Sequence, residues 1–205
     1  MAITHEVMTA EQLRAAERAT MLHTSESTLM DNAAAAIAVH CPAAATVAVL
    51  AGRGNNGGDA LLAGALLAQA GAKVTAVLLS PDAHGRGLAH LTTAGGRAVN
   101  WADARGEAEQ AIGEAALVID GIVGLGGQSG LRAPAQAAVA HITPGTYVVA
   151  VDLPSGLDPD SAEANKPHVV ADLTVTFTAP KACLIREPAA ASAGRVVIAN
   201  VGVAL

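Results

Sequence analysis

Short apolar runs alternate with segments of helical periodicity along most of the chain. The apolar runs are flanked by turn residues, as is typical of strands buried on both faces, and cover residues 46–51, 73–79, 97–100, 117–120 and 147–152. Helical patterns fill intervals between them at residues 59–70 and 88–94. Because strands separated by helices pair in parallel, the alternation predicts a mostly parallel, doubly wound sheet with helices on both faces.

The two ends of the chain differ from this alternating middle. Thr9 and Gln12 form a capping box before a first helix, and a second helix is predicted over residues 27–39. Near the other end, residues 173–177 and 195–199 have the pattern of strands with little helix between them. We expect these last two strands to extend one edge of the sheet.

Composition and charge remove several classes of function. The 205 residues are 52% hydrophobic and 15% charged, but no apolar run is long enough to span a bilayer, and residues 1–9 lack the pattern of a secretory or transit leader. We therefore expect a single domain over residues 1–205 that is soluble, cytoplasmic and without a membrane partner. The net charge of -6 and the aromatic content of 1% argue against a nucleic-acid partner.

The strongest candidate for chemistry is the segment GRGNNGGD at residues 52–59, directly after a predicted strand and before a helix. It contains GxGxxG, and in this context its glycines let backbone amides approach a pyrophosphate at a helix N-terminus. Asn55, Asn56 and Asp59 add oxygens that can accept hydrogen bonds or bind a cation. The structural alternative is a tight turn in which Asp59 caps the helix, a role that is also compatible with a functional loop.

Two other predicted strands end in a carboxylate. Asp120 precedes a run of glycines in VIDGIVGLGGQSG, and Asp152 lies in VDLPSGLD. Each carboxylate either caps a turn or faces a ligand, and the glycines after Asp120 favour the ligand because they allow close backbone approach. If the two strands are neighbours, both side chains project into one crevice beyond the carboxyl ends of the strands. The proline and glycine around Ser155 would hold Asp152 and the Ser155 oxygen in a fixed geometry.

Serine, histidine and cysteine chemistry are disfavoured. Ser155 is not within a GxSxG elbow, and the sequence does not indicate a histidine that could serve as its base. His84 and His90 lack metal-ligand spacing. Cys41 and Cys183 lie far apart without CxxC or Cys/His spacing, so neither a zinc site nor a redox pair is predicted.

In this order and at these intervals, GRGNNGGD, VIDGIVGLGGQSG and AVDLPSGLD resemble the YjeF N-terminal domain family, whose enzymatic members are the NAD(P)HX epimerases. The likeness also covers the opening MTAEQLRAAERA and the closing TVTFTAPKACLI, and so spans almost the whole chain. It implies a Rossmann-like three-layer α/β/α sandwich, a homodimer, and interconversion of the R and S forms of hydrated NADH and NADPH (NADHX and NADPHX). It also implies a functional partner, an ADP- or ATP-dependent NAD(P)HX dehydratase, either separate or fused.

The resemblance further implies two sets of site residues. It places the hydrated cofactor on Asn55, Asn56, Gly57, Gly58, Asp59, Gly124, Leu125, Gly126, Gly127, Gln128, Ser129, Gly130 and Asp152. It places a monovalent cation, usually potassium (K+), on Asn56, Asp120 and Ser155. Oxygen ligands of this kind suit a hard cation rather than zinc or copper.

Asp152 is the candidate catalytic acid. The hydroxylated carbon of the hydrated cofactor is bonded to the ring nitrogen, whose lone pair can expel the hydroxyl group once an acid protonates it. Water then adds to the opposite face of the planar iminium, and ionised Asp152 takes a proton, so that one carboxyl group serves both directions. Lys181, next to Pro180, also matches the family and is interpreted either as an exposed, solubilising lysine or as a ligand contact.

Two other functions share parts of this pattern. An NAD(P)-dependent oxidoreductase also opens with GxGxxG, but Asp82 comes late for the acidic residue that binds the ribose, and little chain remains for a substrate domain. A non-catalytic YjeF-type binding or scaffold module would tolerate loss of the site. The joint presence of Asn56, Asp120, Asp152 and Ser155 favours an enzyme.

Overall fold

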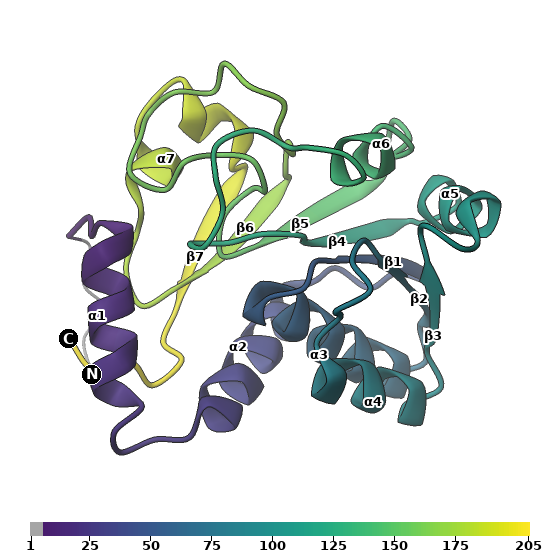
Figure 1. Cartoon of the computed structure of the whole chain (residues 1–205), viewed down its shortest axis with the longest axis horizontal. Coiled ribbons are helices and arrows are strands. Elements are labelled where there is room, and N and C mark those ends of the chain that lie inside the picture. Colours follow the sequence, from purple (N-terminus) through teal and green to yellow (C-terminus); the bar gives the residue numbers. More distant parts are fainter. Residues whose placement is uncertain (1–5) are drawn as a thin grey trace.

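The centre of the computed structural model, which describes residues 6–205, is a seven-stranded sheet (Figure 1). Its strands are β1 (Thr46–Ala51), β2 (Lys73–Leu78), β3 (Arg97–Asn100), β4 (Leu117–Gly121), β5 (Tyr147–Val151), β6 (Leu173–Phe177) and β7 (Arg195–Ala199). They pair in parallel throughout, in the order β3-β2-β1-β4-β5-β6-β7. The predicted parallel, doubly wound sheet is confirmed, with β6 and β7 at one edge.

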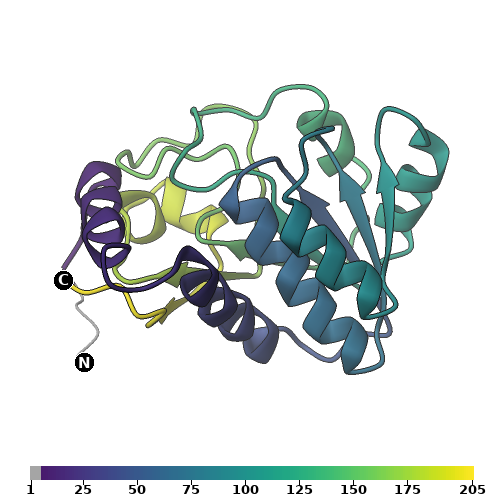
Figure 2. The ribbon, with the colours of Figure 1, turned by 60° about the horizontal axis from the view of Figure 1, so that its bottom comes forward.

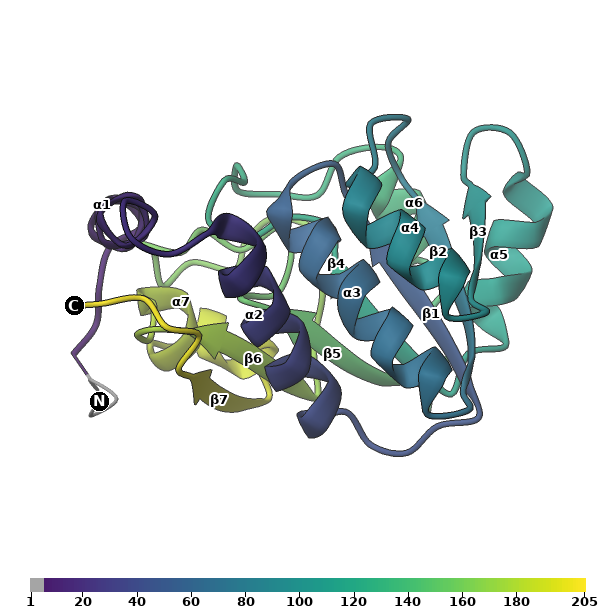
Figure 3. The ribbon, with the colours of Figure 1, turned by 90° about the horizontal axis from the view of Figure 1, so that it is seen from below.

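Helices cover both faces of this sheet, so the predicted three-layer sandwich is also confirmed. One face carries α2 (Glu26–His40), α3 (Asn55–Gln69) and α4 (Gly85–Thr93), which lie side by side in Figures 2 and 3. The other face carries α5 (Arg105–Gly113) and α6 (Ala135–Val139), with α7 (Ala182–Ile185) and the 3-10 helix η1 (Ala189–Ser192) toward β6 and β7. The first helix, α1 (Ala10–Thr20), stands at one end of the molecule.

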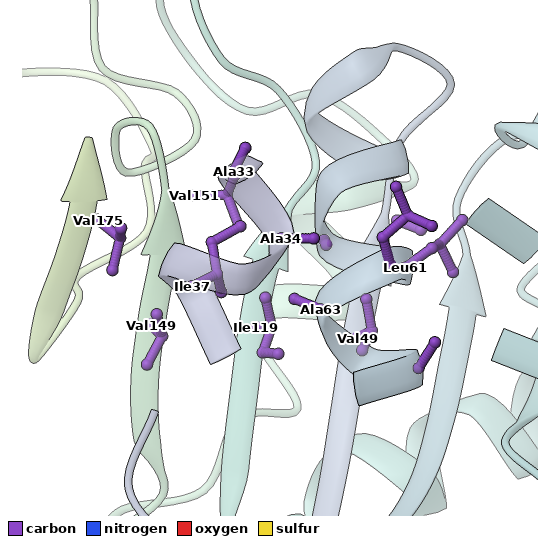
Figure 4. Close-up of a cluster of buried hydrophobic side chains, with 14 of the residues drawn as sticks. Ala33, Ala34, Ile37, Val49, Leu61, Ala63, Ile119, Val149, Val151 and Val175 are labelled. Carbon is purple, nitrogen blue, oxygen red and sulfur yellow. The ribbon is translucent and has the colours of Figure 1, made fainter. Parts of the chain in front are cut away.

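Each central strand is apolar on both faces because alternate side chains enter two separate cores. Toward α2 and α3, Val49 and Val149 pack with Ile37 and Leu61, as Figure 4 shows. On the opposite face, residues such as Val118 pack against α5 and α6. The reversal of strand order between β1 and β4 leaves the carboxyl ends of these two strands open to a ligand, as in other doubly wound sheets.

The start of α3 is the main local difference from the prediction. The helix begins at Asn55, four residues before the predicted start at 59, and its N-cap is Gly54, which makes no side-chain capping bond. Asp59 therefore lies inside the helix and does not cap it, so that interpretation was wrong. The helices α5 and α6 were not predicted, because each buries only two residues and neither shows a clear apolar stripe.

The predicted capping box is confirmed at the start of α1, where the Thr9 hydroxyl accepts a hydrogen bond from the Gln12 amide. The absence of a leader was predicted from residues 1–9, of which 1–5 lie outside the described part of the chain. Within residues 6–205, no helix is both long and apolar enough to cross a membrane.

Candidate active site

A cavity of about 450 Å³ opens beyond the carboxyl ends of the central strands. One side is formed by residues 53–56 and 122–126, together with the charged side chains of Asp59, Asp152 and Lys181. Its apolar side is formed by residues of α1, α2 and the chain near β6 and β7, namely Leu13, Met21, Leu29, Met30, Ala33, Phe177, Val201 and Val203. The cavity thus lies at the position that the reversal of strand order predicts for a ligand.

The glycines after β1 serve close packing of the backbone. A Cβ atom on Gly52 would lie 1.9 Å from the carbonyl oxygen of Ile122, and one on Gly57 would lie 2.2 Å from the carbonyl oxygen of Gly52. A Cβ atom on Gly58 would lie 2.5 Å from the methyl group of Met30. Of the predicted substrate residues in this segment, Asn55, Asn56 and Asp59 line the cavity, whereas Gly57 and Gly58 bring α3 against its neighbours.

Two polar atoms on α3 are buried without a partner among the described residues. They are Nδ2 of Asn56 and Oδ1 of Asp59. Asp59 is only 8% exposed. Buried polar groups are normally hydrogen-bonded, so both atoms are available to a bound molecule or ion. Burial, and then the nearby carboxylate of Asp152, raise the pKa of Asp59 well above its usual range. Asn55 is engaged differently, because its Nδ2 donates to Oε1 of Glu26 at 2.6 Å.

Asp120 is fully buried near the end of β4. Its carboxylate is hydrogen-bonded to Ser155 and does not line the cavity. Its Oδ1 accepts from the Ser155 hydroxyl at 2.6 Å and from the Ile122 amide at 3.2 Å, and its Oδ2 accepts from the Ser155 amide at 2.8 Å. Burial raises the pKa of Asp120 to about 6, and the bonds from Ser155 oppose this rise. Residues 6–205 provide no ion-pair partner for this carboxylate.

Asp152 lies just beyond β5, the neighbour of β4, and its side chain lines the cavity. Its Oδ1 accepts hydrogen bonds from Nζ of Lys181 and, at 3.2 Å, from the hydroxyl of Thr176. Nζ of Lys181 also donates to Thr176 Oγ1 at 2.6 Å. Asp120 and Asp152 are therefore on neighbouring strands, as proposed from the sequence, but only Asp152 faces the cavity.

Lys181 is 1% exposed, which overturns its interpretation as an exposed, solubilising lysine. A tight turn brings it to Asp152, because the amide of Ala179 bonds the carbonyl of Phe177 at 2.7 Å and Thr178 between them has φ of 69°. A buried lysine needs a counter-charge, and Asp152 provides it. The pair could not be identified from the sequence, because its members are far apart in the chain.

Asp152 itself has φ of 69°, in the left-handed region that few residues other than glycine adopt. The amide of Leu153 bonds the carbonyl of Val151 at 2.8 Å, so that Asp152 is the middle residue of a three-residue γ-type turn. Strained backbone of this kind costs about 1–3 kcal/mol and is concentrated at functional sites. Together, the turn and the contacts with Lys181 and Thr176 give the carboxyl group a fixed direction.

The loop after β4 is divided between the cavity and the protein surface. Gly124, Leu125 and Gly126 line the cavity. A Cβ atom on Gly124 would lie 2.8 Å from Asn56 Oδ1 and 3.2 Å from Asp152 Oδ2, so the missing side chain leaves space between these two oxygens. The remaining predicted positions, Gly127, Gln128, Ser129 and Gly130, are outside the cavity lining, and Gln128 bonds Arg132 at 2.5 Å.

The sequence interpretation did not place any residue of α1 in the site. Leu13, Glu17 and Met21 are spaced by four residues, lie on one side of α1 and line the cavity. Arg14 donates to the carbonyl oxygen of Leu125 and so connects α1 to the loop after β4. The available signal was Glu17, a carboxylate within an otherwise apolar helical stripe.

Among residues 6–205, no group of three or more histidine, cysteine, aspartate or glutamate side chains is arranged to hold a metal ion. Cys41 and Cys183 are both free thiols, one half-buried and one buried. Burial raises the pKa of each thiol to about 12, which makes the reactive thiolate rare. The ionisable groups that face the cavity are therefore carboxylates, Lys181 and the two arginines Arg14 and Arg53.

Comparisons with known proteins find relatives that match nearly the whole chain. The chain is 40% identical to the NAD(P)H-hydrate epimerase of Microbacterium testaceum, over 96% of this chain and 76% of that protein. It is 41% identical to the NAD(P)H-hydrate epimerase of Clavibacter sepedonicus, over 96% and 90% of the two chains. It is also 38% identical to the bifunctional NAD(P)H-hydrate repair enzyme Nnr of Mycobacterium tuberculosis, over 95% of this chain and 41% of that enzyme.

A solved structure and a family model complete the comparison. The crystal structure of the yeast protein ynu0 has the same fold, with a TM-score of 0.76 and 19% identity over 94% of this chain and 87% of that one. The model of the family described as YjeF-related protein N-terminus matches residues 26–183. With most of its length matched, the chain belongs to the YjeF-related protein N-terminus family.

Proposed function

We propose that the chain is an isomerase that interconverts the R and S forms of hydrated NADH and NADPH in the repair of nicotinamide cofactors. One observation carries this function: the chain is about 40% identical over nearly its whole length to NAD(P)H-hydrate epimerases, and its Asp152 carboxyl group, held by hydrogen bonds, lines the cavity. Epimerisation by loss and return of water requires such a group, because a proton must be given to and taken from oxygen.

Asp152 is the group that moves the proton. Its Oδ1 is held by Lys181 and Thr176, while its Oδ2 is directed toward Gly124, where no side chain blocks it. In the direction of water loss, protonated Asp152 gives its proton to the hydroxyl group, and the lone pair of the ring nitrogen expels water. In the reverse direction, the carboxylate removes a proton from the water that adds. The contacts with Lys181 and Thr176 keep the oxygen in place for either step.

Backbone and side-chain groups after β1 and β4 hold the rest of the substrate. The N-terminus of α3, which begins at Asn55, directs free amides toward the cavity and suits the pyrophosphate. The unpartnered atoms of Asn56 and Asp59 are available to hydroxyl or carboxamide groups. Residues 124–126 contribute backbone that can approach the ligand closely.

A monovalent cation, K+ in our proposal, would be held by oxygens of Asn56, Asp120 and Ser155. One observation supports this donor set: the Asp120 carboxylate is fully buried without an ion-pair partner among the described residues. Carboxylate, hydroxyl and carboxamide oxygens suit a hard cation. Such a cation would supply the positive charge that the buried carboxylate lacks.

Four further properties complete the proposal. We infer that residues 1–205 form one domain and that two copies of the chain associate. We also infer a cytoplasmic location and a partnership with an NAD(P)HX dehydratase. The bifunctional NAD(P)H-hydrate repair enzymes, of which this chain matches a part, support the partnership.

The test is the rate at which the purified protein interconverts the R and S forms of hydrated NADH, followed by chromatography with and without potassium. The wild type should accelerate the interconversion, and Asp152→Asn should lower the rate by about 10²–10⁴-fold because it removes the proton carrier. Asp103→Asn, the same change at an exposed site, should have the wild-type rate. A folded wild type that binds the cofactor without acceleration contradicts the epimerase and favours a binding module.

A further inference from the structure

Interconversion of the R and S forms requires proton transfer on both faces of the substrate ring. At the hydroxylated carbon, a C–O bond breaks on one face and a new C–O bond forms on the other. Asp152 is held by Lys181, by Thr176 and by a strained turn, so its carboxyl group approaches from a fixed direction. If the proposed epimerase function is correct, a ring that stays in place therefore needs a second proton carrier on another wall.

Glu17 enters the cavity from such a wall. It lies on α1, between Leu13 and Met21 on the side of the helix that lines the cavity, whereas Asp152 and Lys181 follow β5 and β6. Figure 1 shows α1 at the end of the molecule, apart from the layers that cover the sheet. The cavity therefore receives carboxyl groups from two separate parts of the structure.

The Glu17 carboxyl group has no fixed partner. It is half-buried, and it takes part in no hydrogen bond or ion pair with any of the residues from 6 to 205. Arg14, one turn earlier on α1, is instead bonded to the carbonyl oxygen of Leu125. Burial, and next the charge of Asp152, raise the pKa of Glu17 against the opposing charges of Lys181, Arg14 and Arg18, and the raised pKa favours the protonated form of Glu17.

Hydrogen bonds near both ends of α1 hold the helix that carries Glu17 against the rest of the protein. The Ala10 amide donates to Asp160 Oδ1 at 2.8 Å, and the Met8 amide donates to the carbonyl oxygen of Pro180, next to Lys181, at 3.1 Å. At the other end of α1, the Thr20 hydroxyl accepts from the Ala204 amide at 3.0 Å. These contacts hold the helix that carries Glu17 at a fixed position relative to the segment that carries Lys181.

We propose that Glu17 is the second acid/base residue and serves the face of the ring that Asp152 does not reach. Protonated Glu17 gives its proton to the hydroxyl group on its face, and the C–O bond breaks with its electron pair on oxygen, so that water leaves. A second water forms the new C–O bond on the other face and gives its proton to the Asp152 carboxylate. Glu17 is then ionised and Asp152 protonated, which is the starting state of the reverse reaction, and proton exchange with solvent restores the first state.

A single-face exchange of oxygen distinguishes this mechanism from one that uses a single carboxyl group. A variant that retains only one proton carrier can still release water and add another water on the same face. In water labelled with oxygen-18, such a variant should label one epimer without inverting it. Asp59, the other unpartnered carboxyl group of the cavity, is the rival for the second role and is tested beside Glu17.

The experiment measures inversion and oxygen-18 uptake for each epimer of hydrated NADH with wild type, Glu17→Gln, Asp152→Asn and Asp59→Asn. Glu17→Gln should lower inversion by about 100-fold or more, while uptake by one epimer remains within a few-fold of wild type. Asp152→Asn should show the converse, with uptake preserved in the opposite epimer. Glu11→Gln, the same change at an exposed site on α1, should match wild type in both measurements.

Several outcomes would overturn the role of Glu17 and leave the proposed epimerase function in place. The first is unchanged inversion in Glu17→Gln. The second is an equal loss of inversion and of oxygen-18 uptake by both epimers in Glu17→Gln, provided that its thermal unfolding matches wild type. The third is a loss of inversion with preserved uptake by one epimer in Asp59→Asn instead of Glu17→Gln. Inversion by wild type without oxygen-18 uptake would also overturn it, because the C–O bond would then stay intact. A wild type that accelerates neither measurement removes the proposed epimerase itself.

Discussion

Two neighbouring strands, β4 and β5, each have an aspartate within one residue of their carboxyl end, and the two carboxyl groups have very different surroundings. Asp120 is sealed from solvent and accepts three hydrogen bonds, two of them from Ser155. Asp152 is 6% exposed, lines the cavity and is paired with Lys181. Position at a strand end is therefore not enough to make a carboxylate reactive; its partners and its access to the cavity decide its role.

The difference shows how the two sites depend on each other. Ser155 follows Asp152 by three residues, and the turn that ends β5 carries it back to Asp120. One short segment thus presents one carboxyl group to the cavity and covers the other. We infer that Asp120 stabilises the loop and its proposed cation, whereas Asp152 carries out proton transfer.

The largest effect on stability is expected from Lys181→Met. This change leaves the buried carboxylate of Asp152 without its counter-charge and should lower the free energy of unfolding by about 3–5 kcal/mol. Denaturant unfolding of wild type and variant measures the effect. The double variant Asp152→Asn, Lys181→Met removes both charges and should recover part of the loss, as a double-mutant cycle would show. A loss below about 1 kcal/mol for Lys181→Met would mean that the pair does not hold the site together.

The ending of β5 also shows what the sequence could and could not predict. The carboxylates at 120 and 152 were predicted at one edge of the sheet because parallel strands end together there. Lys181 was left open between an exposed lysine and a ligand contact, because its burial depends on a turn at Thr178 and a partner 29 residues away. The same limit applies to Glu17, whose environment depends on where α1 packs.

The start of α3 was misjudged for a related reason. Glycines and asparagines have low helix propensity, so residues 55–58 were interpreted as loop. In the structure, Gly57 packs on Gly52 and Gly58 packs on Met30, and these tertiary contacts support a first helical turn. By contrast, the strands were predicted to within a residue, because each is a short apolar run whose pattern is local.

A smaller effect is expected from Ser155→Ala. The change removes the 2.6 Å hydrogen bond to Asp120 and leaves the amide of Val123 without its acceptor, which should cost about 1–3 kcal/mol of unfolding free energy. The same variant tests the proposed cation. Potassium should raise the unfolding temperature of wild type, because an ion that binds only the folded state stabilises it, and should raise that of Ser155→Ala less. Equal shifts in the two proteins would contradict Ser155 as a ligand.

The effect that depends most on pH is expected from Asp59→Asn. Burial raises the pKa of Asp59 in the folded protein above its unfolded value, so the folded state binds the proton more tightly. Wild type should therefore lose stability relative to Asp59→Asn as pH rises above about 4, up to the folded pKa. Unfolding of both proteins across this range gives the difference. A gap that stays constant with pH would show that Asp59 is not desolvated.

Proton transfer requires an acid at position 152, and the γ-type turn at the end of β5 independently restricts which amino acids can occupy this position. Its φ of 69° is adopted readily by glycine, and among other residues chiefly by asparagine and aspartate, whose short polar side chains fit the left-handed region. In a saturation library, glycine and asparagine would adopt the positive φ but would lack the carboxyl group. Glutamate would have the carboxyl group but would adopt the positive φ less readily. Mutational tolerance at this position is therefore narrower than proton chemistry alone requires, and aspartate is the residue that meets both demands.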